Sequence, residues 1–86
     1  MMLFDAVLDS WPSAVQTLSN LRFLHLQRCR LSSLPDFAFQ AEDQRQFPSP
    51  RLRSLILIQN GMQSLGPQAL AGQEASLNTL DLSRNA

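Results

Sequence analysis

The sequence predicts an α/β solenoid, with short parallel strands on a concave side and turns or short helices on a convex side. The first observation behind this prediction is a repeated apolar spacing. L-x-x-L-x-L-x-x-C-x-L begins at Leu21, returns at Leu52 with Asn and Met in its last two places, and starts again at Leu77. The second is that two full copies and a partial third fall within 86 residues, which indicates stacked repeat units.

The centre of each copy predicts a short strand. Two leucines there are separated by one residue, and this period of two is typical of a half-buried strand. The pairs are Leu24 and Leu26, Leu55 and Leu57, and Leu80 and Leu82. Beyond each pair the apolar spacing lengthens, so the chain is expected to turn back over its own core. Stacked coils of this kind form a parallel sheet on one side and enclose one continuous leucine core.

These residues resemble the leucine-rich repeat family over residues 21–86. An apolar residue follows five positions after the last motif leucine, as Phe39 follows Leu34, and this resembles the "typical" subclass. The resemblance implies that one side chain at each repeat end turns inward and hydrogen-bonds the backbone of a neighbouring coil. The three repeat-end positions are Cys29, Asn60 and Asn85. Cysteine is small and tolerates burial, so it is a suitable substitute for asparagine.

We divide the chain at the motif starts. Residues 1–20 are a truncated preceding repeat or lead-in segment, 21–51 a repeat with an insertion at 40–51, 52–76 a repeat, and 77–86 the start of a further repeat. The first interval, 31 residues, exceeds the usual 20–29. The excess falls in the polar, proline-containing stretch 40–51, which we expect to be an exposed loop. Because the pattern reaches both ends without a capping unit, we expect a fragment of a longer array.

Residues 1–20 allow two interpretations. In the first, Leu3 and Leu8 occupy positions of a 23-residue repeat, with Trp11 in a leucine place and Ala6 in the asparagine place. In the second, a short helix starts at Ser10, has Pro12 in its first turn and places Val15 and Leu18 on one face. The two are compatible, because the convex side of such coils can be helical.

Composition narrows the classes of function. Seven arginines balance seven acidic residues, and no basic stripe is present to bind phosphates, so nucleic acid is not an expected partner. One cysteine cannot form an internal disulfide. No apolar run has the length of a membrane span, and Asp5 and Asp9 lie where a signal peptide is apolar. Any membrane association is expected through regions absent from this chain.

The titratable residues do not predict an enzyme. His25 is the only histidine, and it occupies the outward strand position that Ile56 and Asp81 occupy in the next two copies. Strands about 4.8 Å apart would place His25 and Asp81 about 10 Å apart, too far for a base and the acid that orients it. A metal site formed by His25 and Cys29 is not expected either, because Cys29 should point inward while His25 points outward. We therefore expect no catalytic residues, no metal, no cofactor and no small-molecule substrate.

The outward strand positions are the candidate binding surface. Isoleucine at two of them is unexpected, because folding does not require an apolar residue there. Together with an aromatic residue and polar neighbours, the isoleucines predict a protein-binding site on the concave face. The candidate residues are Phe23, His25, Gln27, Ile56, Ile58 and Asp81.

The expected function is protein recognition by a repeat array. The segment resembles ectodomains of membrane proteins with leucine-rich repeats, such as Toll-like receptors and the transmembrane proteins that anchor latent transforming growth factor beta. Two stretches are similar to the latter group: LRFLHLQRCRLSSLPDFAFQ and LAGQEASLNTLDLSRN. That similarity implies a membrane or extracellular location. The alternatives are a cytoplasmic adaptor or scaffold, and a repeat segment appended to an enzyme.

Overall fold

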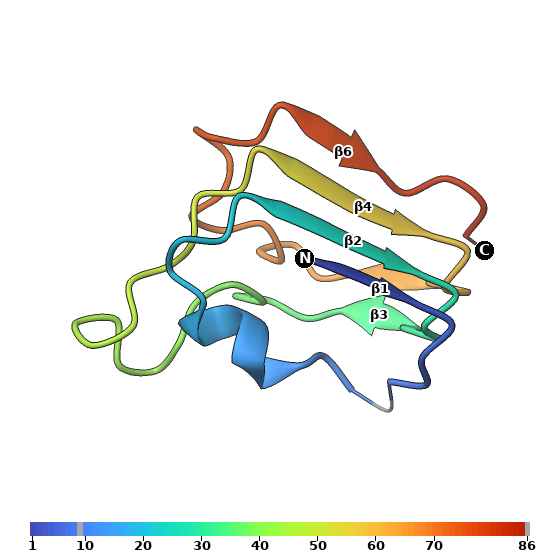
Figure 1. Cartoon of the computed structure of the whole chain (residues 1–86), viewed down its shortest axis with the longest axis horizontal. Coiled ribbons are helices and arrows are strands. Elements are labelled where there is room, and N and C mark those ends of the chain that lie inside the picture. The colour runs from blue at the N-terminus through green and yellow to red at the C-terminus, as the bar shows by residue number, and fades with distance from the viewer. Residues whose placement is uncertain (9, 86) are drawn as a thin grey trace.

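A computed structural model, which describes residues 1–8 and 10–85, contains two parallel sheets. The four strands of the larger sheet lie side by side in the order β1-β2-β4-β6 (Figure 1). They are β1 (Met2–Phe4), β2 (Phe23–Gln27), β4 (Ser54–Ile58) and β6 (Thr79–Asp81). The smaller sheet pairs β3 (Ser33–Leu34) with β5 (Ser64–Leu65), and a 3-10 helix, η1, spans Ser13–Thr17. Parallel strands with little helix fit a leucine-rich-repeat-like fold, and the predicted short parallel strands are confirmed.

The strand register follows the repeated leucines. Leu24 pairs with Leu55, and Leu55 pairs in turn with Leu80. Leu26 pairs with Leu57 in the same way. Because side chains alternate between the two faces of a strand, this register places the motif leucines of successive coils on one face. The four leucines of β2 and β4 have no exposed surface and form the centre of the core.

The return segments close the other side of this core. Leu31, Leu34, Ala38 and Phe39 of the first full coil are buried, and Met62 and Ala69 of the second are buried with them. Trp11 is partly buried against this core, and its Nε1 donates to the carbonyl of Ala38 at 2.6 Å. Its ring also packs edge-on against Phe39, with the ring centroids 5.4 Å apart.

A backbone turn recurs after each strand of the larger sheet. Asp5, Arg28, Gln59 and Arg84 hold equivalent places, and all four have positive φ, between 55° and 59°. Such a left-handed conformation costs a non-glycine residue about 1–2 kcal/mol. The next residue in each full coil offsets this cost through hydrogen bonds. Its backbone N–H donates to the repeat-end side chain of the following coil, as Cys29 does to Asn60 Oδ1 at 2.8 Å.

The repeat-end side chains form a ladder along the coils. Asn60 Nδ2 donates to the carbonyl of Leu26 at 3.0 Å, and Asn85 Nδ2 donates to the carbonyl of Leu57 at 2.7 Å. The fully buried thiol of Cys29 reaches the equivalent acceptor, the carbonyl of Leu3, at 3.4 Å. These side chains therefore turn inward and bond the preceding coil, as the family resemblance implied.

Residues 1–20 contain both a strand and a short helix. Strand β1 pairs with β2 so that Leu3 lies beside Leu26, and η1 follows on the return side (Figure 1). The helix starting at Ser10 is wrong in two respects. The observed helix begins at Ser13, so that Pro12 precedes it, and it ends at Thr17, so that Leu18 lies outside it and is 41% exposed while Val15 is buried.

The insertion at 40–51 is only partly the exposed loop that we expected. Residues 42–46 are exposed, but Ala41 and Pro50 at its two ends are buried. Gln40 is held to the next coil by a hydrogen bond from its Nε2 to the carbonyl of Ala71 at 3.2 Å. The expectation of exposure over the whole stretch is therefore wrong at Ala41 and Pro50, where the chain contacts the core.

The first prediction tests the inward and outward strand positions. Leu57→Ala should lower the free energy of unfolding of the full-length protein by about 2–5 kcal/mol, because it opens a cavity between stacked coils. Ile58→Ser, one residue along, should lower the free energy of unfolding much less, since the Ile58 side chain is only partly buried and lies on the other face. Thermal and urea unfolding of both variants measures the difference. Equal losses would contradict the strand register.

The second prediction concerns the exposed part of the insertion. Limited digestion with trypsin should cut first after Arg45, in the exposed stretch 42–46. Cleavage after Arg51 should be slower, because the N–H of Leu52 is bonded to the buried side chain of Gln73 at 2.8 Å. Mass spectrometry of the early fragments identifies the first site, and Arg45→Gln is the control that should remove it. A first cut after Arg51 would show that the insertion is anchored differently.

Candidate functional site

The candidate residues lie together on the face of the larger sheet that points away from the core, here named the outer sheet face. Strand β2 contributes Phe23, His25 and Gln27, β4 contributes Ile56 and Ile58, and β6 contributes Asp81. The register pairs His25 with Ile56 and Ile56 with Asp81, so the six positions occupy neighbouring strands. This is the face that the sequence analysis expected to be concave. The proposed role of the six residues in binding a partner stays a prediction.

Sequence reasoning missed the contribution of β1 to this face. Met2 pairs with His25 and Phe4 pairs with Gln27, so both project to the outer sheet face beside β2. Phe4 is 41% exposed, and its ring lies edge-on to the His25 ring with the centroids 4.9 Å apart. The signal was available in the 23-residue offset that aligns Leu3 with Leu26, since the residues on either side of Leu3 must then point outward.

These side chains form an apolar patch around His25. Phe23 is 39% exposed and lies edge-on to the same imidazole, with a centroid distance of 6.4 Å. Ile56 follows on the next strand, beside His25, and Ile58 lies one step further along β4. The apolar patch is defined by Met2, Phe4, Phe23, Ile56 and Ile58.

A chain of polar contacts borders the apolar patch at the strand ends. Nε2 of His25 contacts Oε1 of Gln27 at 3.0 Å, and because an amide oxygen can only accept, the imidazole donates. Nε2 of Gln27 donates to Oε1 of Gln59 at 2.8 Å. Arg28 donates to the same oxygen at 3.3 Å and to the carboxylate of Asp5, with Nη2 and Oδ2 3.2 Å apart. The contacts link three successive coils.

Two carboxylates at the face are held in their ionised form. The hydrogen bond from Arg28 lowers the pKa of Asp5. Desolvation opposes this effect, and the positive charge of Arg28 adds a further lowering. The pKa of Asp81 is lowered first by the hydrogen bond from the Ser83 hydroxyl and then by the bond from the Ser83 backbone N–H. The backbone bond is 2.9 Å long. The outer sheet face therefore presents fixed charges of both signs beside its apolar patch.

Among the described residues, His25, Asp81 and Cys29 lie apart from one another. Ile56 separates His25 from Asp81 across the sheet, as the sequence analysis predicted, and the His25 ring is engaged with Gln27 instead. Cys29 is fully buried on the core side. Within residues 1–8 and 10–85, no three His, Cys, Asp or Glu side chains are grouped so that they could hold a metal ion. The described part of the chain also has no helix long and apolar enough to span a membrane.

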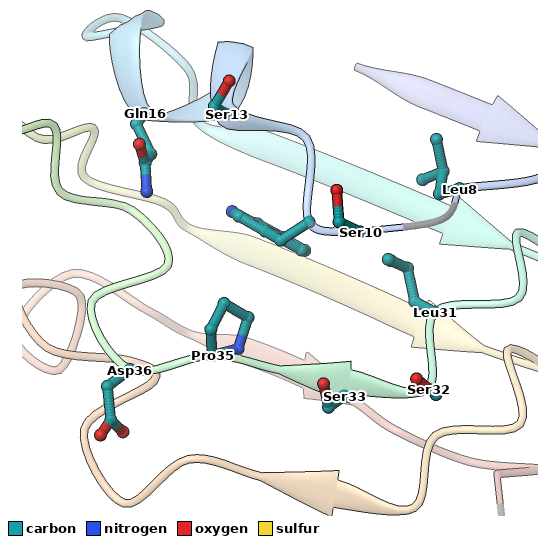
Figure 2. Close-up of a pocket in the computed structure, with 10 residues that line it drawn as sticks. Leu8, Ser10, Ser13, Gln16, Leu31, Ser32, Ser33, Pro35 and Asp36 are labelled. Carbon is teal, nitrogen blue, oxygen red and sulfur yellow. The ribbon is translucent and has the colours of Figure 1, made fainter.

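A separate hollow of about 470 Å³ lies on the return side, between the segment that leads into η1 and strand β3 (Figure 2). It is lined by Leu8, Ser10, Trp11, Ser13, Gln16, Leu31, Ser32, Ser33, Pro35 and Asp36. Among the described residues that line it, the one carboxylate is already engaged, because Oδ1 of Asp36 accepts the backbone N–H of Gln68 at 2.8 Å. Hydroxyl groups and an occupied carboxylate do not supply an activated nucleophile with its base.

Residues 20–41 match the family model described as Leucine Rich Repeat. No curated protein and no solved structure matches the chain. The matched residues include all of β2 and the return segment up to Ala41, in which Leu31, Leu34 and Phe39 are buried. The match therefore supports a leucine-rich repeat in this protein, and repeats of this kind suggest protein–protein interaction.

Proposed function

We propose that this chain is a segment of a leucine-rich repeat solenoid that recognises a protein partner through its outer sheet face, as a binding module and not as an enzyme. The observation that carries the proposal is the apolar patch. Ile56 and Ile58 lie on the face opposite the leucine core, where packing within the chain does not require them. Exposed aromatic side chains from β1 and β2 extend the same surface.

The surroundings of the apolar patch support a protein ligand. Interfaces between proteins combine an apolar centre, enriched in aromatic side chains, with a polar rim. Here the rim consists of the Asp5–Arg28 ion pair and Gln59 at the strand ends, and of Asp81 at the end of β6 with Ser83 two residues beyond it. Because these rim groups are already hydrogen-bonded to one another, little reorganisation is needed when a partner covers the face.

The repeat array is further proposed to belong to a membrane receptor or a growth-factor-anchoring ectodomain. Support comes from the resemblance of the segment to ectodomains of membrane proteins with leucine-rich repeats, such as Toll-like receptors. The stretches around β2 and β6 resemble transmembrane anchors of latent transforming growth factor beta. A cytoplasmic adaptor or scaffold is the alternative, and a repeat segment appended to an enzyme is a further one.

The third prediction tests the outer sheet face. A partner isolated on the immobilised full-length protein should bind Phe23→Ser and Ile58→Ser variants about 10- to 100-fold more weakly, since an apolar anchor at an interface centre contributes roughly 1–3 kcal/mol. Phe37→Ser is the matched control, because Phe37 is 44% exposed but lies on the return side. Calorimetric titration measures affinity, and thermal unfolding verifies the fold. Unchanged affinity in folded Phe23 and Ile58 variants would contradict the proposed face.

The fourth prediction tests the compartment. Full-length protein with an epitope tag beside the repeat segment should be labelled by a membrane-impermeant biotin reagent on intact cells, because an ectodomain faces the medium. A cytoplasmic protein expressed in the same cells serves as the negative control. Labelling that requires permeabilised cells would contradict the ectodomain proposal and favour the adaptor.

A further inference from the structure

Two arginines and an asparagine occupy equivalent positions where three strands begin. Arg22, Arg53 and Asn78 each precede a strand of the larger sheet by one residue, and these strand starts lie side by side (Figure 1). Backbone hydrogen bonds hold them in register, since the N–H of Arg53 donates to the carbonyl of Arg22 at 2.8 Å and that of Asn78 donates to the carbonyl of Arg53 at 2.9 Å. Neighbouring strands are about 4.8 Å apart, so the side chains emerge close together.

A third arginine joins them around a hollow of about 340 Å³. The hollow, here named the arginine hollow, is lined by Arg22, Arg51, Arg53, Ala75, Ser76 and Asn78. Among the described residues, none that lines it carries a carboxylate. Within the same residues the one ion pair is Arg28–Asp5, at the opposite ends of the strands. Three arginines therefore line one hollow, and no described lining residue is acidic.

A buried amide fixes the backbone that carries these arginines. Gln73 is fully buried, and its Nε2 donates to the carbonyl of Pro50 at 2.6 Å while its Oε1 accepts the N–H of Leu52 at 2.8 Å. The backbone on both sides of Arg51 is thus held in place. In the preceding coil, Arg22 lies just before β2, and its Nη1 donates to the carbonyl of Leu21 at 3.0 Å. The cationic groups belong to ordered segments and not to a free loop.

The hollow is part of an uneven distribution of charge. Six of the seven arginines lie next to or within the turns that flank the larger sheet: Arg22, Arg28, Arg30, Arg51, Arg53 and Arg84. Four of the seven acidic residues lie in the return segments: Asp36, Glu42, Asp43 and Glu74. The chain has zero net charge, yet the edges of its sheet side are basic. Such a surface attracts an acidic partner and orients it before contact.

We propose that the arginine hollow binds the side-chain carboxylates of an acidic segment on the same protein partner that covers the outer sheet face. This inference rests on the proposed function, because Arg22, which lines the hollow, directly precedes Phe23 of the apolar patch. Like charges at neighbouring strand positions repel each other, and a bound carboxylate removes that cost. A guanidinium donates two parallel hydrogen bonds to a carboxylate, and the amide of Asn78 is a further donor at the hollow.

The fifth prediction uses a fluorescently labelled oligoglutamate peptide as the probe. The full-length protein should bind it, and Arg22→Gln combined with Arg53→Gln should weaken binding by about tenfold or more, since two charge-assisted contacts are lost. Arg45→Gln is the control that changes the same type of charge in the exposed insertion, and it should leave the affinity unchanged. Replacing Arg22 and Arg53 by Lys should restore only part of the affinity, because an ammonium group cannot form the paired contact. Fluorescence anisotropy measures each affinity, and thermal unfolding verifies each fold.

Three results would overturn the inference. The first is no binding of oligoglutamate. The second is an equal loss in Arg45→Gln, which would show general charge attraction. The third is full restoration by Lys, which would exclude the paired contact. A titration with the isolated partner separates this inference from the proposed function. Weaker binding of the partner by Ile58→Ser, but not by the Arg22 and Arg53 variants, would overturn the hollow and leave the outer sheet face in place. Weaker binding by the arginine variants alone would support the hollow and contradict the apolar patch.

Discussion

The inward hydrogen bond of each repeat-end side chain is the interaction on which the rest of this structure depends. Asn60 reaches the carbonyl of Leu26, and Asn85 reaches that of Leu57, so each coil is bonded to the one before it where its strand ends. These are buried or partly buried polar groups, and leaving such a group unpaired would cost about 1–3 kcal/mol. The strands are therefore aligned at their ends, and that alignment sets which residues face the core and which face outward.

The first coil is attached through a different set of contacts. Cys29 donates only a weak thiol hydrogen bond to the carbonyl of Leu3, and Ala6, in the asparagine place, has no side-chain donor. Contacts between distant residues supplement the ladder here. The guanidinium of Arg28 pairs with Asp5 across the strand ends, and the indole of Trp11 bonds the carbonyl of Ala38. The position of β1 matters for function, because it adds Met2 and Phe4 to the apolar patch.

The two proposed binding features are consequences of the same stacking. Residues at alternate strand positions supply the apolar patch, and residues one step before each strand supply the arginine hollow. Because consecutive coils repeat the backbone geometry, equivalent side chains line up across the sheet although 31 residues separate Arg22 from Arg53. For this reason the sequence alone shows no basic stripe. The arginines form a cluster only after the chain has returned to begin the next strand.

The sequence by itself determined the parallel strands, the buried leucines of β2 and β4 and the six candidate residues of the outer sheet face, and the family resemblance implied the inward repeat-end positions. It could do so because a period of two within each strand and a recurring motif are local patterns that hold wherever the coils stack. Only the tertiary structure decided that Phe4 joins that face, that Ala41 and Pro50 are buried, and that three arginines share one hollow. These features depend on contacts between coils, such as those of the buried Gln73, whose partners are 21 and 23 residues away. No local pattern encodes them, because they arise from how the return segments pack.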